Sequence, residues 1–254
     1  MRARRCRVAE PARSDGERTF ASFSSEDHNM WYCLDRPKPK YRGVLHMWCA
    51  LSSPVWCAYQ LSLCDAGNAP AAGLSLFAMA FLFSASSLYH RGSWTLSTEQ
   101  CLMKLDYIGI YLLVAFSVAP CYVQLLPPTA SYTVLGLLAL TVVAGVCLTL
   151  AELKLGKHSM VAVYVAQAAL QLVPMGTSLL SSRSVFQGLL PTERWMLGGL
   201  ATCYLAGSQV YAHSTPSLWP ATFGYHELWH LLIAASVVLT YACNCSVLAR
   251  PCYA

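Results

Sequence analysis

Long runs of apolar residues, separated by short polar stretches, fill the chain from about residue 43 onward. A helix needs about 20 apolar residues, at a rise of about 1.5 Å each, to cross a hydrocarbon core about 30 Å thick. Most connections are short, so consecutive helices should run antiparallel. The pattern predicts an all-α fold, a seven-transmembrane helix bundle, with residues 43–254 as one domain. The seven predicted spans are 43–64, 70–89, 106–126, 131–151, 159–181, 195–212 and 227–248.

Composition supports the same class. Hydrophobic residues make up 56% of the chain and charged residues only 11%, and the mean hydropathy is +0.45. Soluble domains contain about 25% charged residues. The chain is therefore predicted to be an integral, multi-pass membrane protein.

The first 42 residues have a different character. They are polar and basic and show no apolar period long enough to bury a face. Segments of this kind remain disordered in isolation. The Arg-rich beginning resembles an organelle transit peptide, but acidic residues follow soon, and the apolar core of a signal peptide is missing. We interpret residues 1–42 as a disordered basic N-terminal tail.

The basic residues also predict an orientation, because loops rich in Lys and Arg stay in the cytoplasm. With the N-terminus inside, 14 of the 17 Lys and Arg residues are cytoplasmic. The formal net charge of +5 is thus mainly a signal of topology, and no basic patch on a folded surface indicates a nucleic-acid partner. We predict a cytoplasmic N-terminus and a C-terminus outside, with three basic residues on the outer side: Arg183, Arg194 and Arg250.

Five polar residues converge on this map at the cytoplasmic side. His90 ends the second predicted span, Asp106 begins the third, and His226 and His230 begin the seventh. Residues four apart share a helix face, so Ser86 lies one turn deeper than His90. Imidazole nitrogens suit zinc, and three protein ligands leave a fourth position open for water. The arrangement predicts a zinc site of His90, His226 and His230.

Asp106 admits two interpretations. A carboxylate inside a spanning segment costs about 2.5 to 3.5 kcal/mol on insertion scales and usually serves a function. A carboxylate at a helix N-terminus is instead stabilised by the helix dipole, by about 0.3 to 1 kcal/mol. We favour the first interpretation, in which Asp106 accepts a hydrogen bond from a metal-bound water.

The sequence FGYHELWH also has an H-x3-H spacing with a Glu directly after the first histidine, as in soluble zinc proteases. That similarity is misleading, because Glu227 points about 100° away from His226 on a helix. We expect Glu227 at the level of the lipid headgroups. The alternative for His226 and His230 is that both are interfacial histidines that bind no metal. The remaining histidines are interpreted as interfacial, with His46 and His213 as reserve ligands; the set is His28, His46, His158 and His213.

Three blocks carry a family resemblance: SASSLYH at 84–90, LDYIGIYLLVAFSVAP at 105–120 and FGYHELWHLLIAAS at 223–236. They resemble the signature blocks of the hemolysin III family, which is similar to the progestin and adipoQ receptors and is grouped with alkaline ceramidases. The resemblance implies seven helices and zinc bound by His90, His226 and His230. It also implies that Asp106 and Ser86 lie beside the metal and its water.

Several functions remain open at this stage. The first is a zinc-dependent hydrolase of a lipid amide or ester, in which Asp106 orients the water and Ser86 helps to hold the oxyanion. The second is a lipid-responsive receptor or regulator with structural zinc, and pore formation ranks last. Membrane lipids are the expected partners, one of them a possible substrate. An apolar cavity that reaches the open position of the metal would favour hydrolysis.

Overall fold

The computed structural model describes residues 39–92, 94–152, 156–176, 184–219 and 221–250. Within these ranges the chain is mostly helical, and its strand-like pairing is limited to an isolated bridge between Trp219 and Phe223. The predicted all-α class is confirmed. The helices are α2 (Val44–Ser62), α3 (Ala69–Arg91), α4 (Leu96–Phe116), α5 (Ala119–Leu125), α6 (Pro128–Leu150), α7 (Lys157–Gly176), α8 (Val185–Gly188), α9 (Pro191–His213) and α10 (Tyr225–Leu248).

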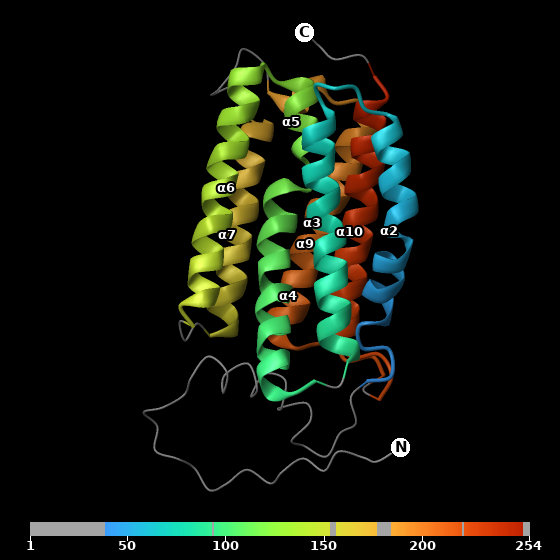
Figure 1. Ribbon diagram of the computed structural model, residues 1–254, viewed down its shortest axis with the longest axis vertical. Helices are drawn as coiled ribbons and strands as arrows, with labels where there is room; N and C mark the ends of the chain where they lie inside the picture. Colours follow the sequence, from blue (N-terminus) through green and yellow to red (C-terminus); the bar gives the residue numbers. More distant parts are fainter. Residues whose placement is uncertain (1–38, 93, 153–155, 177–183, 220, 251–254) are drawn as a thin grey trace, which may run out of the picture.

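The long helices run side by side along one axis and form a bundle (Figure 1). α10 packs along α9, and α3 packs against both α2 and α4. α4 also contacts α6 and α7, which form one side of the bundle (Figure 1). We call the end with the first turns of α2 and α10 and the last turns of α3 and α9 the base. The opposite end, where α5 lies, is the top.

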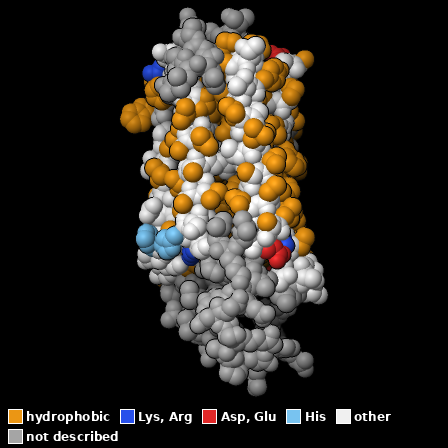
Figure 2. Space-filling model, turned by 90° about the vertical axis from the view of Figure 1, so that its left-hand side faces the viewer, with side chains coloured by type: hydrophobic (Ala, Val, Ile, Leu, Met, Phe, Trp, Pro, Cys, Tyr) orange, Lys and Arg blue, Asp and Glu red, His pale blue; other side chains and the backbone are white. Residues whose placement is uncertain are grey.

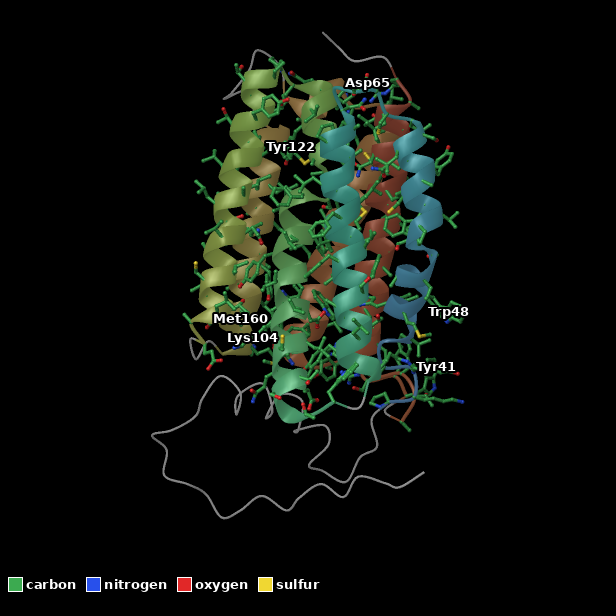
Figure 3. All side chains as sticks on the ribbon, in the orientation of Figure 1. Tyr41, Trp48, Asp65, Lys104, Tyr122 and Met160 are labelled. Atoms are coloured by element: carbon green, nitrogen blue, oxygen red, sulfur yellow. The ribbon has the colours of Figure 1, made fainter. Side chains whose placement is uncertain are left out.

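The outer surface is that of a membrane protein. Among the described residues, four helical segments are long and apolar enough to cross a membrane: Ala69–Arg91, Ser97–Leu125, Pro128–Leu150 and Tyr225–Leu248. Figure 2 shows hydrophobic side chains over the middle of one face and charged side chains toward its ends. In Figure 3, Trp48 points away from the bundle. The multi-pass membrane prediction is confirmed, whereas the count of seven spans and the orientation stay predictions.

The third predicted span begins much earlier than expected. The sequence indicated a helix from residue 106, but α4 begins at Leu96, where the side chain of Thr95 accepts a hydrogen bond from Thr98 N at 3.4 Å. The polar stretch ahead of residue 106 therefore belongs to the helix. Asp106 lies in the middle of α4, so a helix N-terminus cannot explain its presence.

A break divides the remainder of that span into α4 and α5. Pro120 lacks an N–H, and its ring would clash with the carbonyl four residues earlier in a continuous helix. Polar side chains from α3 and α10 fill the break: Ser117 O accepts hydrogen bonds from Ser75 Oγ at 2.7 Å and from Asn244 Nδ2 at 2.8 Å. Tyr122, which points inward in Figure 3, donates to Gln171 O at 2.7 Å and ties α5 to α7. These contacts fix the top half of the bundle.

The predicted tail lies mostly outside the described residues, which begin at residue 39. Residues 39–42, which the sequence pattern assigned to the tail, pack against the base. Lys40 N and Tyr41 N donate hydrogen bonds to Ala221 O and Thr222 O at 3.1 and 3.3 Å. The packed part of the chain thus starts a few residues before the first apolar run.

Candidate metal centre

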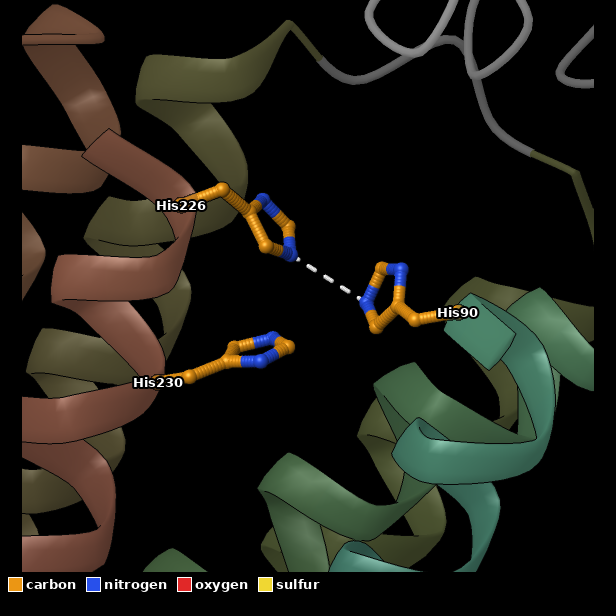
Figure 4. A group of neighbouring side chains, drawn as sticks. All are labelled: His90, His226 and His230. Atoms are coloured by element: carbon orange, nitrogen blue, oxygen red, sulfur yellow. Dashed lines mark hydrogen bonds between the residues drawn. The ribbon is translucent and has the colours of Figure 1, made fainter. Parts of the chain in front are cut away.

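Three histidines meet at the base of the bundle. His90 comes from the last turn of α3, and His226 and His230 come from the first two turns of α10, one turn apart on the same face (Figure 4). The Nε2 atoms of His90 and His226 are 3.1 Å apart. Each of the three residues offers a ring nitrogen that lies within 4.8 Å of the other two.

These nitrogens fit a divalent metal ion. Zinc–nitrogen bonds of about 2.0 to 2.1 Å in a tetrahedral site place the nitrogens about 3.3 Å apart. The two nitrogens of His90 and His226, 3.1 Å apart, are close to this spacing, and the nitrogen of His230 lies within 4.8 Å of both. His90 and His230 are buried and His226 is partly buried, so the donors are shielded from competing water. The three-histidine group can therefore hold a metal ion.

Asp106 and Ser86 lie beside this group. Asp106 Oδ2 is 3.6 Å from His90 Nε2, beyond hydrogen-bond distance but close enough for the carboxylate to reach an ion or a water bound at that nitrogen. Ser86, one turn deeper than His90 on α3, is buried, and its hydroxyl faces the Asp106 carboxyl. Ser86 Oγ has no hydrogen bond of standard geometry to the described residues. All five predicted site residues thus come together, although their roles stay predictions.

His46 is not the interfacial side chain that the sequence suggested. It is 2% exposed and stacks on His230, with ring centroids 4.0 Å apart and planes at 14°. Phe83 contacts the same ring edge-on, with ring centroids 5.1 Å apart and planes at 61°. This placement depends on how α2 packs against α10, and nothing in the local sequence indicates it.

The other histidines lie outside the group. His213, the second reserve ligand, is exposed and lies beside His158, with ring centroids 5.8 Å apart. His28 lies outside the described residues. The choice of His90, His226 and His230 among seven histidines agrees with the cluster that the structure forms.

The expectation for Glu227 was wrong. Instead of lying at the headgroup level, Glu227 is buried, and its Oε2 accepts a hydrogen bond from Gly224 N at 2.7 Å. Its Oε1 forms an ion pair with Arg42 Nε at 2.6 Å. A glutamate at the third position of a helix can bend back to the unpaired N–H groups that precede the helix. The buried Arg42 was interpreted from the sequence only as a topology signal.

A cavity of about 220 Å³ reaches the histidines. His90, Asp106 and His226 line it at the base, and mainly apolar side chains of α4, α7, α9 and α10 line the rest. Three further lining residues are exposed on the outside of the bundle, by 37, 49 and 57%, so the cavity communicates with the lipid-facing surface at α7 and α9. These residues are Val165, Leu172 and Leu205.

The basal rim of the cavity carries a positive charge. Lys157, the first residue of α7, lies over the rings of Tyr211 and Tyr225, with Nζ 4.5 and 4.7 Å from their centroids. Lys157 Nζ also donates a hydrogen bond to Ser214 Oγ at 2.7 Å. The rim is therefore polar and cationic, whereas the interior is apolar.

Apolar helices around a buried three-histidine group define a multi-pass α-helical membrane protein with a candidate metal centre. Residues 34–241 match the family described as haemolysin-III related. Because this match spans most of the chain, the protein belongs to the haemolysin III family, which is related to the progestin and adipoQ receptors. The family prediction made from the three sequence blocks is confirmed.

Proposed function

We propose that this protein is a zinc-dependent intramembrane hydrolase that cleaves an amide or ester bond of a lipid. The observation that carries the proposal is the apolar cavity, which connects the lipid-facing surface to the three histidines. A metal that only tied α3 to α10 would need neither a cavity nor a carboxylate beside it. The donor set favours zinc, because imidazole suits a borderline-soft divalent ion.

Each residue has a distinct role in this proposal. His90, His226 and His230 would hold the ion, which when bound would supply a water of lowered pKa and polarise the scissile carbonyl. Asp106 would accept a hydrogen bond from the attacking water, take up its proton and pass it to the leaving amine or alcohol as the carbon–nitrogen or carbon–oxygen bond breaks. Ser86 donates its hydroxyl to the oxygen that becomes negatively charged. The apolar part of the cavity holds the acyl chain and excludes water from the bond that breaks.

A lipid-responsive receptor with structural zinc is the second candidate. The observation that favours it is that the three histidines come from only two helices, so an ion there would link the end of α3 to the start of α10. Pore formation has less support, because buried hydrogen bonds around Ser117 and Asn244 occupy the bundle interior in the top half.

The test compares hydrolysis with metal binding in the purified full-length protein. We expect about one zinc ion per chain and release of fatty acid from at least one member of a panel of ceramides, glycerolipids and lysolipids. Ala201→Phe places a ring inside the cavity on α9 and should lower the turnover of long-chain lipids roughly tenfold, since an overfilled cavity excludes its ligand. Zinc content should not change.

Leu137→Phe, on the exposed face of α6, is the matched control and should leave both quantities unchanged. Stoichiometric zinc without fatty-acid release from any lipid would favour the receptor interpretation. Equal turnover in Ala201→Phe and the unmodified protein would show that the cavity does not admit the substrate.

A further inference from the structure

The residues just before and at the start of α2 lie across the base of the bundle. We call residues 39–46 the basal strap. Its backbone is hydrogen bonded to the loop that leads into α10, through Lys40 N to Ala221 O and Tyr41 N to Thr222 O. The strap is therefore attached to the segment from which His226 and His230 begin.

Arg42 in the strap makes the closest contact with α10. Its Nε lies 2.6 Å from Glu227 Oε1, and the two side chains are 4 and 2% exposed. The other carboxylate oxygen accepts the hydrogen bond from Gly224 N. Both oxygens of Glu227 are thus held, which fixes the first turn of α10 next to His226. Burial of an ion pair carries a desolvation cost, so the Arg42–Glu227 pair need not stabilise the fold. We therefore interpret the pair as one that positions the start of α10.

The strap also touches the other two histidines. Gly43 has a φ of 71°, which favours glycine, and an added Cβ would lie only 2.7 Å from His90 Cβ. His46 stacks on His230 at 4.0 Å. Gly43 and His46 of the strap therefore lie directly against His90 and His230. Arg42 acts through Glu227 on the helix turn that carries His226.

We propose that the basal strap holds the three histidines in the spacing that a metal requires, with Arg42 as the principal positioning residue. The inference rests on the proposed metal site but concerns the geometry of its ligands. Residues that orient metal ligands without binding the metal themselves typically change metal affinity by about 10- to 100-fold when they are replaced. Arg42 forms its ion pair with Glu227, so we expect its effect on affinity to pass mainly through the position of α10.

The bundle contains a matched control for this arrangement. At the top, Glu193 occupies the third position of α9, and its Oε2 accepts a hydrogen bond from Leu190 N at 2.8 Å. The same oxygen is paired with Arg250 Nη2 at 2.8 Å. This second pair caps a helix and links two segments as the first does, but it lies at the end opposite the histidines.

The experiment measures zinc affinity by chelator competition on the full chain in lipid nanodiscs, for Arg42→Met, Arg42→Lys and Arg250→Met. We expect Arg42→Met to weaken zinc binding roughly 10- to 100-fold. Arg42→Lys keeps the charge and should recover most of the affinity, to within about fivefold of the unmodified protein. Arg250→Met should lower the thermal midpoint yet leave affinity within about threefold. Unchanged affinity in Arg42→Met, or an equal loss in Arg250→Met, would overturn the inference.

Hydrogen exchange on the metal-free protein separates this inference from the proposed function. Without zinc, Arg42→Met should raise amide exchange in residues 225–231 about tenfold, because the first turn of α10 opens more often, whereas Arg250→Met should not. A protein that binds no zinc at all would refute the metal site while the exchange result still decides whether the strap positions α10. Equal exchange in both variants would refute the strap.

Discussion

The base and the top of the bundle are built around the same kind of ion pair and differ in what lies next to it. Arg42–Glu227 at the base and Arg250–Glu193 at the top each join a buried glutamate at the start of a helix to an arginine from a distant segment. At the top, Ser246 Oγ also donates to Glu193 Oε1 at 2.7 Å, so the carboxylate is bound within the protein on both oxygens.

The base pair borders imidazoles and a cavity instead. Both ring nitrogens of His46 and the hydroxyl of Ser86 are buried without a hydrogen bond to the described residues. Buried polar atoms of this kind are costly unless a ligand, ion or water satisfies them. A buried ion pair therefore does not mark a functional site by its own presence. The histidines and the cavity packed beside it distinguish the base from the top, where buried polar atoms such as Arg250 Nε also lack a hydrogen bond to the described residues.

The largest expected effect comes from the histidines themselves. His90→Ala, His226→Ala and His230→Ala should each remove most of the bound zinc, because two protein ligands are left of three. Metal analysis of the purified variants measures this loss. His213→Ala is the control, because His213 is exposed and lies outside the group. If His46→Ala abolished zinc binding while one of the three variants kept it, the ligand assignment would be wrong.

Asp106→Asn should separate chemistry from metal binding. The amide keeps the shape of the side chain but cannot take up a proton, so turnover should fall at least about 100-fold. Zinc should remain bound, with an affinity roughly 10- to 100-fold weaker. Lipid hydrolysis and zinc competition on the same preparation measure both quantities. Undiminished turnover would exclude Asp106 from the mechanism.

Asn244→Leu tests whether the polar contacts at the top of the bundle serve stability rather than metal binding. Asn244 Nδ2 donates to Ser117 O at 2.8 Å and to Ser75 Oγ at 3.1 Å, both at the break between α4 and α5. The variant loses both hydrogen bonds and leaves the Ser117 carbonyl with one donor fewer. The free energy of unfolding should therefore fall by about 2 kcal/mol. Thermal unfolding measures the loss, and zinc affinity should not change. A fall in zinc affinity would mean that the two ends are coupled.

The smallest effect is expected for the exposed ion pair at the base. Lys104 Nζ and Glu152 Oε1 are 2.5 Å apart, but their side chains are 23 and 47% exposed. Exposed pairs typically contribute about 0 to 1 kcal/mol. Lys104→Met should therefore shift the thermal midpoint very little and leave zinc affinity as it is. If Lys104→Met lowered zinc affinity as much as Arg42→Met, the charge at the base, rather than the buried contact, would control the site.

Much of the fold and the site could be predicted from local patterns. Apolar runs predicted the all-α class and the membrane location, because a helix in lipid must satisfy its own backbone and present apolar side chains. The pairs Ser86 and His90, and His226 and His230, could be predicted because helical spacing alone places residues four apart on one face. The three sequence blocks identified the family, and the histidines they contain are the three that the structure brings together.

What the sequence pattern missed depends on contacts between distant helices. The start of α4 at Leu96 was missed because polar residues at a helix end resemble a loop until packing shows that they belong to the helix. His46 and Glu227 were placed at the surface because their neighbours in the sequence do not reveal α2 against α10 or Arg42 beside the carboxylate. The cavity, too, arises only where side chains of six helices, α2, α3, α4, α7, α9 and α10, fail to fill the space between them. The sequence by itself determined the helices and the residue types of the site, and only the tertiary structure decided what surrounds them, because burial and pairing between remote segments have no local signature.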